Sequence, residues 1–280
     1  MRLLERGTRP LARAAVVSLI AITTLAGCSR LSFIKPDYSR NDFRRTAAEL
    51  DVSTDTRDKN AIAQRLALQQ GQLAFTRGDL AGARKAAEQV LAADPGSASA
   101  HTLRAVVADR EGQPELAGDH YRRAVELAPH EGGMHNNYGT WLCANGRADE
   151  SLEWFEQALA DRNYGTPAAA LANAGACADK AGEGKRAVRY LEAALELEPD
   201  NPVALAAMAE HEFRAGRAFR ARAFSQRRLA AAPANASSLL LASQIEQKLG
   251  DTEAAAGYVQ RLRAEFPDSS GSGTGEDGKR

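Results

Sequence analysis

Histidines, cysteines and one serine–lysine pair are the side chains of this 280-residue chain that could carry out catalytic or metal-binding chemistry. The five histidines have no cysteine partners at zinc-site intervals, and after His130-Glu131 the next histidine, His135, comes one residue too late for an HExxH zinc motif. These two histidines flank a pair of glycines, so we expect both to be solvated turn residues. Ser32 and Lys35 form an S-x-x-K without any companion motif. No glycine-rich phosphate loop or G-x-S-x-G elbow is present, so the sequence predicts a non-enzymatic protein without metal, cofactor or small-molecule substrate.

The amino-terminal region predicts export from the cytoplasm. A basic leader precedes residues 14–26, which are apolar and uncharged, and the leader's arginines are Arg2, Arg6, Arg9 and Arg13. An apolar stretch of this length is too short to cross a bilayer, and the charge order is that of a secretory signal.

The signal ends in Leu25-Ala26-Gly27-Cys28, which resembles a bacterial lipobox. The resemblance implies that residues 1–27 are removed and that Cys28 carries a diacylglyceryl thioether and an acylated amino terminus, which would hold the protein on a lipid bilayer. In such lipoproteins, an Asp directly after the lipidated cysteine commonly marks retention in the inner membrane. This chain has Ser29 there, so the resemblance implies that the protein lies on the periplasmic face of the outer membrane. The alternative is an ordinary cleaved signal with an incidental cysteine.

The other two cysteines, Cys143 and Cys177, are a candidate disulfide, because an exported chain meets an oxidising compartment. A bridge between them would close the chain into a loop and constrain the unfolded state. The alternative is two small buried thiols whose side chains diverge.

Six glycines at nearly constant spacing indicate the elements that position these residues. The steps from one glycine to the next are 34, 34, 36, 34 and 34, and a period of this size indicates stacked helix-turn-helix units, an architecture that binds other proteins. At one fixed distance after each glycine comes the residue expected to end the second helix. The pairs are Gly78 and Pro95, Gly112 and Pro129, Gly146 and Asn163, Gly182 and Pro199, Gly216 and Pro233, and Gly250 and Pro267.

Small residues at two further positions predict close packing of the two helices within each unit. The first helix carries a small residue seven positions before the turn glycine, namely Gly71, Ala105, Gly139, Gly175, Ala209 or Ser243. The second helix carries a small residue five positions after the turn glycine, namely Ala83, Ala117, Ser151, Ala187, Ala221 or Ala255.

The pattern resembles the tetratricopeptide repeat, most closely in the third unit, where Gly139, Leu142, Ser151, Phe155 and Ala158 stand at the family's offsets. The resemblance implies an all-α fold, a right-handed solenoid of six repeats over residues 61–268. The last two units match least well, because Glu212 and Glu246 stand where the family prefers Tyr.

The flanking segments predict a tether and a disordered tail. Residues 28–60 mix charged and aromatic side chains without periodicity, apart from a possible short helix at 41–50, and residues 269–280 have nothing to bury. Once residues 1–27 are removed, 32 basic and 35 acidic residues remain, with no basic block that would indicate nucleic acid.

In tetratricopeptide arrays the first helices line a concave groove, and that resemblance implies which side chains face a partner. We expect Leu68, Phe75 and Val106 to form an apolar opening of the groove, and the alternative for the first two is packing against the tether or a capping helix. Leu68 and Gln72 occupy the places of the Lys and Asn that clamp peptide carboxylates in some members. Further groove positions are Asn136, Thr140, Cys143, Asp179 and Val203.

A narrower resemblance is carried by the strings NNYGTWLC at 136–143 and NAGAC at 173–177. They resemble the type IV pilus biogenesis and stability lipoprotein, the pilotin of the pilus secretin, which is an outer-membrane lipoprotein of six such repeats. The resemblance implies a chaperone that binds secretin subunits and promotes their localisation and assembly. The alternative is a lipoprotein scaffold of another cell-envelope assembly machine.

Overall fold

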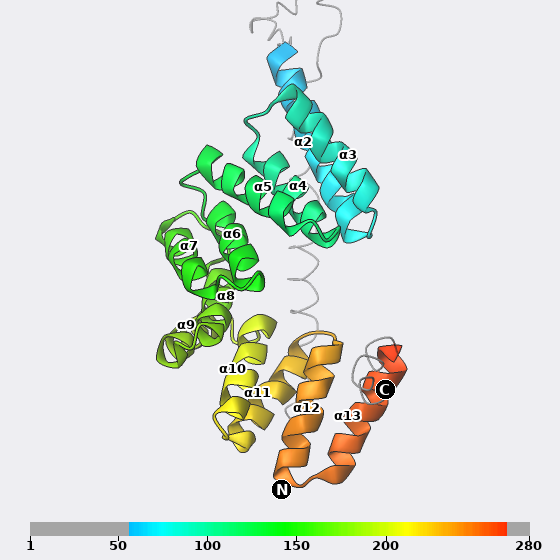
Figure 1. The fold of residues 1–280 in the computed structure, drawn as a ribbon, viewed down its shortest axis with the longest axis vertical. Helices are drawn as coiled ribbons and strands as arrows, with labels where there is room; N and C mark the ends of the chain where they lie inside the picture. Colours follow the sequence, from blue (N-terminus) through cyan, green and yellow to red (C-terminus); the bar gives the residue numbers. More distant parts are fainter. Residues whose placement is uncertain (1–55, 268–280) are drawn as a thin grey trace, which may run out of the picture. The chain divides into compact units, whose positions relative to one another are not determined.

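The computed structural model describes residues 56–267, and this part of the chain forms twelve α-helices and no strand (Figure 1). The signal, the lipobox, most of the predicted tether and the predicted tail lie outside the described residues. The helices are Thr56–Thr76 (α2), Leu80–Ala93 (α3), Ala98–Arg110 (α4), Pro114–Leu127 (α5), Gly132–Ala144 (α6), Ala148–Ala160 (α7), Pro167–Lys180 (α8), Gly184–Leu197 (α9), Pro202–Arg214 (α10), Ala218–Ala231 (α11), Ala236–Leu249 (α12) and Thr252–Glu265 (α13).

The helices pack as six successive hairpins, from α2 with α3 to α12 with α13, and the second helix of each hairpin contacts the first helix of the next. The predicted all-α solenoid of six helix-turn-helix units is confirmed. Helix α2 starts at Thr56, before Ala61, the residue at which we expected the array to begin.

The periodic glycines form the turn inside each hairpin. All six adopt a left-handed conformation, with φ between +74° and +83°, which glycine reaches without the steric cost that a Cβ brings. Five second helices end two residues before their proline, as α3 does at Ala93 before Pro95.

The predicted small positions are buried where the two helices of a hairpin meet. Ala105 and Ala117 are fully buried in the second hairpin, and Ser151 is fully buried in the third. At Gly175 an added Cβ would lie 2.5 Å from Cγ of Leu191, so the backbones of α8 and α9 approach as closely as glycine permits.

The last two hairpins form although their Tyr position holds glutamate. Glu212 and Glu246 are only 1% and 4% exposed. Arg217 and Arg220 pair with Glu212, and Arg222 pairs with Glu246, so each buried carboxylate has a cationic partner. The match to the repeat pattern is weak here because an ion pair replaces the usual aromatic contact.

The longer step between Gly146 and Gly182 has a local cause. The connection between α7 and α8 covers residues 161–166, whereas the other connections between hairpins, such as residues 94–97, have four residues. Within it Tyr164 packs on Gly132, where an added Cβ would lie 2.9 Å from Cγ of the tyrosine. The carboxylate of Asp161 accepts a hydrogen bond of 2.9 Å from the Gly132 amide.

Between Thr56 and Pro267, no helix has the combination of length and hydropathy needed to cross a bilayer.

Candidate protein-binding groove

The first helices of the hairpins lie next to one another along the array. Contacts join α2 to α4, α4 to α6, α6 to α8, α8 to α10 and α10 to α12. Among the described helices, no two second helices make comparable contacts. The first helices therefore form the inner side of the array, which is the side where the sequence places the groove.

The apolar opening of the groove is half-buried rather than fully exposed. Leu68, Phe75 and Val106 pack against a cluster formed by Ala83, Ala87, Leu103 and Val107. Leu68 and Phe75 of α2 thus contact the neighbouring helices α3 and α4. From the sequence we considered a partner, the tether or a capping helix for these two side chains, but not this contact.

A cation covers part of that opening. The guanidinium of Arg110, at the end of α4, lies 5.4 Å from the ring centroid of Phe75. Gln72, one turn before Phe75 on α2, is exposed. A ligand entering here would meet the edge of an apolar cluster, an amide and a positive charge.

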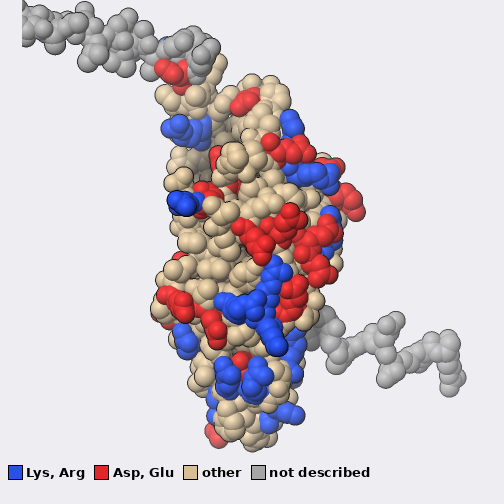
Figure 2. Space-filling model, turned by 90° about the vertical axis from the view of Figure 1, so that its left-hand side faces the viewer, with Lys and Arg blue, Asp and Glu red and all other residues tan. Residues whose placement is uncertain are grey.

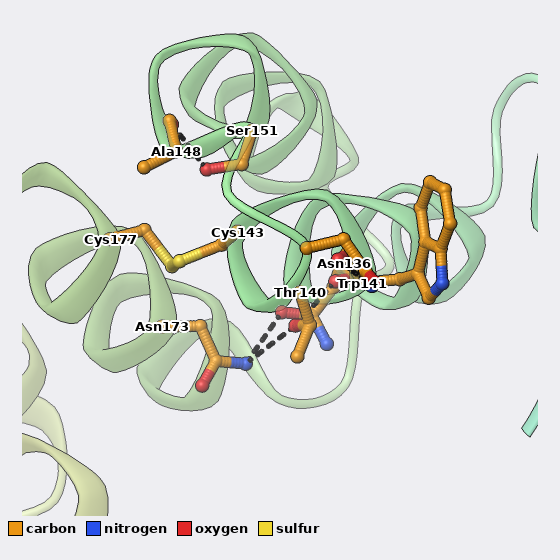
Figure 3. Close-up of a disulfide and its surroundings, with 9 residues drawn as sticks. Asn136, Thr140, Trp141, Cys143, Ala148, Ser151, Asn173 and Cys177 are labelled. Carbon is orange, nitrogen blue, oxygen red and sulfur yellow. Dashed lines mark hydrogen bonds between the residues drawn. A yellow bond between two sulfur atoms is a disulfide. The ribbon is translucent and has the colours of Figure 1, made fainter. Parts of the chain in front are cut away.

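In the middle of the array, a disulfide joins α6 to α8 (Figure 3). Cys143 and Cys177 are bonded with their Cα atoms 5.8 Å apart, and both residues are buried. The structure thus places Cys143 in a covalent bond between hairpins rather than free in the groove.

Next to the disulfide, polar side chains connect the same two helices (Figure 3). The amide nitrogen of Asn173 donates to Oδ1 of Asn136 at 3.0 Å and to Oγ1 of Thr140 at 3.3 Å. Asn136 and Thr140 were expected in the groove, but Asn173, from the NAGAC string, was not. Its amide lies next to the disulfide, and Thr140 is exposed, so hydrogen-bonding groups remain available to a ligand.

Further along, a carboxylate connects α8 to α10. Oδ1 of Asp179 lies 2.8 Å from Nδ1 of His211, and its other oxygen pairs with Arg214. Asp179 is therefore engaged between hairpins. Val203, on α10, is exposed.

The aromatic residues of NNYGTWLC do not line the groove. Tyr138 and Trp141 are buried and stack with ring centroids 5.9 Å apart, and the ring of Trp154 meets Tyr138 edge-on at 4.8 Å. Burial also raises the pKa of Tyr121, whose ring lies 6.3 Å from Trp141. These residues form the core between the second and third hairpins.

One histidine prediction was wrong. His135 was expected to be a solvated turn residue, but it lies inside α6 and is buried against Trp154, with ring centroids 5.7 Å apart. Burial lowers the pKa of His135. His130 is exposed in the turn, as expected. In residues 56–267, no three His, Cys, Asp or Glu side chains converge as a metal site would require.

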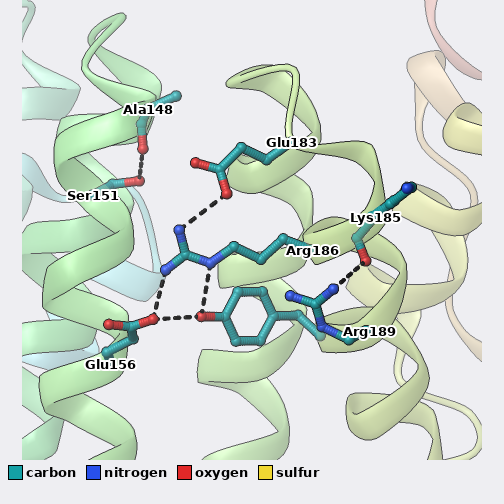
Figure 4. A network of polar contacts seen from close by, with 8 residues as sticks. Ala148, Ser151, Glu156, Glu183, Lys185, Arg186 and Arg189 are labelled. Carbon is teal, nitrogen blue, oxygen red and sulfur yellow. Dashed lines mark hydrogen bonds and ion pairs between the residues drawn. The ribbon is translucent and has the colours of Figure 1, made fainter.

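On the outer side of the array, an ion pair joins the second helices α7 and α9. Arg186 of α9 donates to Glu156 of α7 at 2.5 Å and to Glu183 at 3.0 Å, and the hydroxyl of Tyr190 donates to Glu156 (Figure 4). On the face shown in Figure 2, acidic and basic side chains lie side by side. This face does not form a block of one charge sign.

Comparisons with known proteins agree with this architecture. Tetratricopeptide repeat family models match residues 68–132, 131–199 and 237–269. The solved structure of PilW, described as a widely conserved type IV pilus biogenesis factor, is 30% identical. The match covers 74% of this chain and 94% of PilW, with a TM-score of 0.66.

The chain belongs to the tetratricopeptide-repeat family of type IV pilus biogenesis factors.

A second member of this family is the type IV pilus assembly protein PilF of Pseudomonas aeruginosa. It is 28% identical over 201 residues, which is 71% of each chain. The solved PilF structure is 27% identical, covers 76% of this chain and 96% of PilF, and has a TM-score of 0.64. The family assignment fits a site that offers apolar, amide and charged contacts rather than catalytic groups.

Proposed function

We propose that this protein is a pilotin, an outer-membrane lipoprotein that binds secretin subunits and promotes their localisation and assembly for type IV pilus biogenesis. The observation that carries the proposal is the similarity to PilW, which extends over nearly all of that pilus biogenesis factor, together with the groove of the first helices.

The groove suits recognition of a polypeptide segment. Side-chain amides and hydroxyls, as at Asn136, Thr140 and Asn173, can bond to a peptide backbone, and the apolar edge at Leu68 and Phe75 can take an apolar side chain. Since helix α6 is bonded to α8, these groups are held in place before a partner arrives, which reduces the entropy lost on binding.

The proposal also includes a lipid anchor at Cys28. Replacing Cys28 by Ser should release the protein from the outer-membrane fraction or leave the leader uncleaved, and mass spectrometry should find the wild-type mature chain beginning at an acylated Cys28. An unchanged outer-membrane fraction in the Cys28→Ser variant would contradict the anchor without touching the groove.

The groove is tested with Leu68→Asp together with Phe75→Asp, scored by secretin multimers and surface pili. Because both side chains pack on the core, the helical signal and the thermal melt are recorded first. Gln72→Arg is the parallel variant: it adds charge at an exposed groove position that does not pack inside. A matched control is Leu197→Asp, at an exposed leucine on the second helix α9.

We expect both groove variants to lose secretin multimers while the control keeps them. Normal multimers in folded groove variants would remove this groove from the proposal. Normal multimers in a strain lacking the whole protein would overturn the pilotin assignment and favour the alternative, a scaffold of another envelope assembly machine.

A further inference from the structure

Helix α11 differs from the other second helices in its charge. Between Phe213 and Ile245 the chain has six arginines and no aspartate or glutamate. The arginines are Arg214, Arg217, Arg220, Arg222, Arg227 and Arg228. Each of the other second helices carries at least one Asp or Glu, as α9 does at the exposed Glu192 and Glu196. Positive charge is therefore not interspersed with negative charge along α11.

The carboxylates that pair with these arginines lie beneath them. Glu212 is 1% exposed and pairs with both Arg217 and Arg220, and the largely buried Asp179 pairs with Arg214. The three arginine side chains are between 43% and 59% exposed. Because the anionic groups lie inside and the guanidinium groups outside, the solvent side of this region presents positive charge. The face shown in Figure 2 carries both signs as a whole, but its largest group of adjoining Lys and Arg side chains lies in the lower half, at the level of α9 to α11 in Figure 1.

An uncharged stripe runs along the exposed side of the same helix. Its four residues follow one another at spacings of four, three and four, so they share one helical face, and all four are exposed. We call these residues the α11 stripe: Phe219, Ala223, Gln226 and Ala230. Phe219 is 75% exposed, so its ring contributes little to the core of the array. In the helical register, Arg220 flanks the stripe on one side and Arg222 on the other.

We propose that the α11 stripe and its arginines lie on an anionic phospholipid surface. A helix that rests on a membrane places apolar side chains in the headgroup region and surrounds them with basic residues. The ring of Phe219 enters that region, and the guanidinium groups beside it pair with lipid phosphates, for which their planar, two-pronged geometry is suited.

An acidic segment of a protein would match the same charge. The preference for lipid rests on the proposed anchor at Cys28, which would keep the array beside a membrane. An acyl anchor on a tether sets how far the array can move from the bilayer, whereas a contact through α11 would also set its orientation. The first helices lie on the inner side of the array and α11 on the outer side, so the groove at this hairpin would open away from the bilayer, where a partner can reach it.

The test uses the mature chain carrying Cys28→Ser, which has no acyl chains of its own. It is sedimented with vesicles of phosphatidylcholine, with or without phosphatidylglycerol. Without residues 1–27 the chain has more acidic than basic residues, so its overall charge does not attract it to anionic lipid. We expect binding only to the vesicles that contain phosphatidylglycerol, and we expect this binding to decrease as salt is added.

The variants on α11 are chosen to leave every buried carboxylate paired. In Arg220→Gln with Arg227→Gln, Glu212 keeps Arg217, and Arg227 donates to the Pro199 carbonyl rather than to a carboxylate. This double variant should weaken binding about 25-fold, because each arginine near an anionic surface contributes about fivefold. Phe219→Ser should weaken it about tenfold through the loss of the inserted ring.

Matched controls make the same changes on other second helices. Arg122→Gln with Arg123→Gln removes two arginines from α5 whose side chains are 54% and 52% exposed. Leu197→Ser removes an exposed apolar side chain from α9. Both controls should bind the vesicles as the parent chain does, and the helical signal of every variant is recorded alongside.

Several outcomes would overturn the proposal. They are equal binding to both kinds of vesicle, binding to neither, unchanged binding by the α11 variants, and equal weakening by the controls. Capture of a polyglutamate peptide without vesicle binding would assign the surface to an acidic protein instead. Because the vesicles contain no secretin and the chain is not acylated, none of these outcomes decides the pilotin role or the anchor, which have their own tests above.

Discussion

Glu246 shows how one residue can depart from the repeat pattern without breaking the fold. Its carboxylate is buried and paired with Arg222, which lies 24 residues earlier on α11. The equivalent position in the third hairpin holds Leu142, which is fully buried without any charge. An apolar side chain therefore suffices at this position when no arginine faces it.

We predict that Arg222→Ala lowers the free energy of unfolding by about 3 kcal/mol, because it leaves the Glu246 carboxylate buried without its partner. Adding Glu246→Leu should restore stability to near the wild-type value. Urea denaturation of the four members of this double-mutant cycle measures the coupling. Arg261→Ala removes the exposed pair with Glu265 and should change stability by about 0.5 kcal/mol or less. Equal losses in the Arg222→Ala single and the double variant would contradict the pairing.

Two histidines on facing helices share a hydrogen bond. The Nδ1 atoms of His101 and His120 lie 2.8 Å apart, and Nε2 of His101 lies 3.2 Å from the Pro95 carbonyl. Since a carbonyl only accepts, Nε2 of His101 carries a hydrogen, and its Nδ1 accepts from Nδ1–H of His120. Burial, followed by the charges of His101 and Arg104, lowers the pKa of His120 below its ordinary value of 6.5.

This lowered pKa predicts a pH dependence of stability. The contribution of His120 is fully present above pH 6.5 and is lost as pH falls from 6.5 toward the folded-state pKa, because the unfolded chain then binds the proton more readily. Burial also lowers the pKa of His135, so this residue contributes to the pH dependence with the same sign. We expect the urea concentration at the midpoint of unfolding to decrease as pH is lowered from about 7 to 5.5, and to decrease less in the His120→Asn variant. A midpoint that increases as pH is lowered over this interval would contradict a lowered pKa of His120 in the folded state.

At the scale of the helix, the fold depends on how closely two backbones approach. Gly175 of α8 faces Leu191 and the Ala187 carbonyl of α9, so any side chain at this position must displace its neighbours. Gly257 of α13 has no atom within 4 Å of the place where a Cβ would lie.

These two helical glycines form a matched pair of substitutions. Gly175→Ala should lower the free energy of unfolding by about 1–3 kcal/mol through overpacking. Gly257→Ala should raise it by about 0.5–1 kcal/mol, because alanine favours the helix and meets no neighbour. Thermal and urea denaturation of both variants measures the difference. Equal shifts of stability in the same direction for the two substitutions would contradict a close approach of α8 and α9 at Gly175.

At the scale of the whole molecule, the disulfide bridges a distinctive junction. Cys143 and Cys177 join the third and fourth hairpins, where the connection of residues 161–166 is two residues longer than the others. In an array whose hairpins contact mainly their neighbours, each junction couples the two halves of the array that it joins. The covalent bond and the Asn173 hydrogen bonds fix α8 against α6 at this point.

Reduction should therefore destabilise the array. On the chain-entropy account, a bridge between cysteines separated by 34 positions in the sequence contributes about 3–4 kcal/mol. Urea denaturation with and without reductant should show that loss, and the double variant Cys143→Ser, Cys177→Ser should not respond to reductant. Peptide mapping without reduction should find the linked pair in protein isolated from cells. Free thiols at both positions, or unfolding unaffected by reductant, would count against a bond in the exported protein.

The sequence alone determined the hairpins, their turns and the close contacts within them. Turn glycines such as Gly146 and small residues such as Ser151 recur at fixed offsets, because each hairpin solves the same packing problem with its own residues and its immediate neighbours. The same register placed Cys143 and Cys177 on adjacent first helices.

The packing of neighbouring hairpins sets which side chains are covered, and the sequence pattern did not predict this. Glu246 is buried because Arg222 from another helix reaches it, and Phe75 is half-buried because α3 and α4 pack beside it. His135 is buried against Trp154, and Asn173 meets Asn136 from a distant part of the chain. These contacts depend on shape and partner chemistry across the stacking interface, and a periodic pattern within one helix does not specify them.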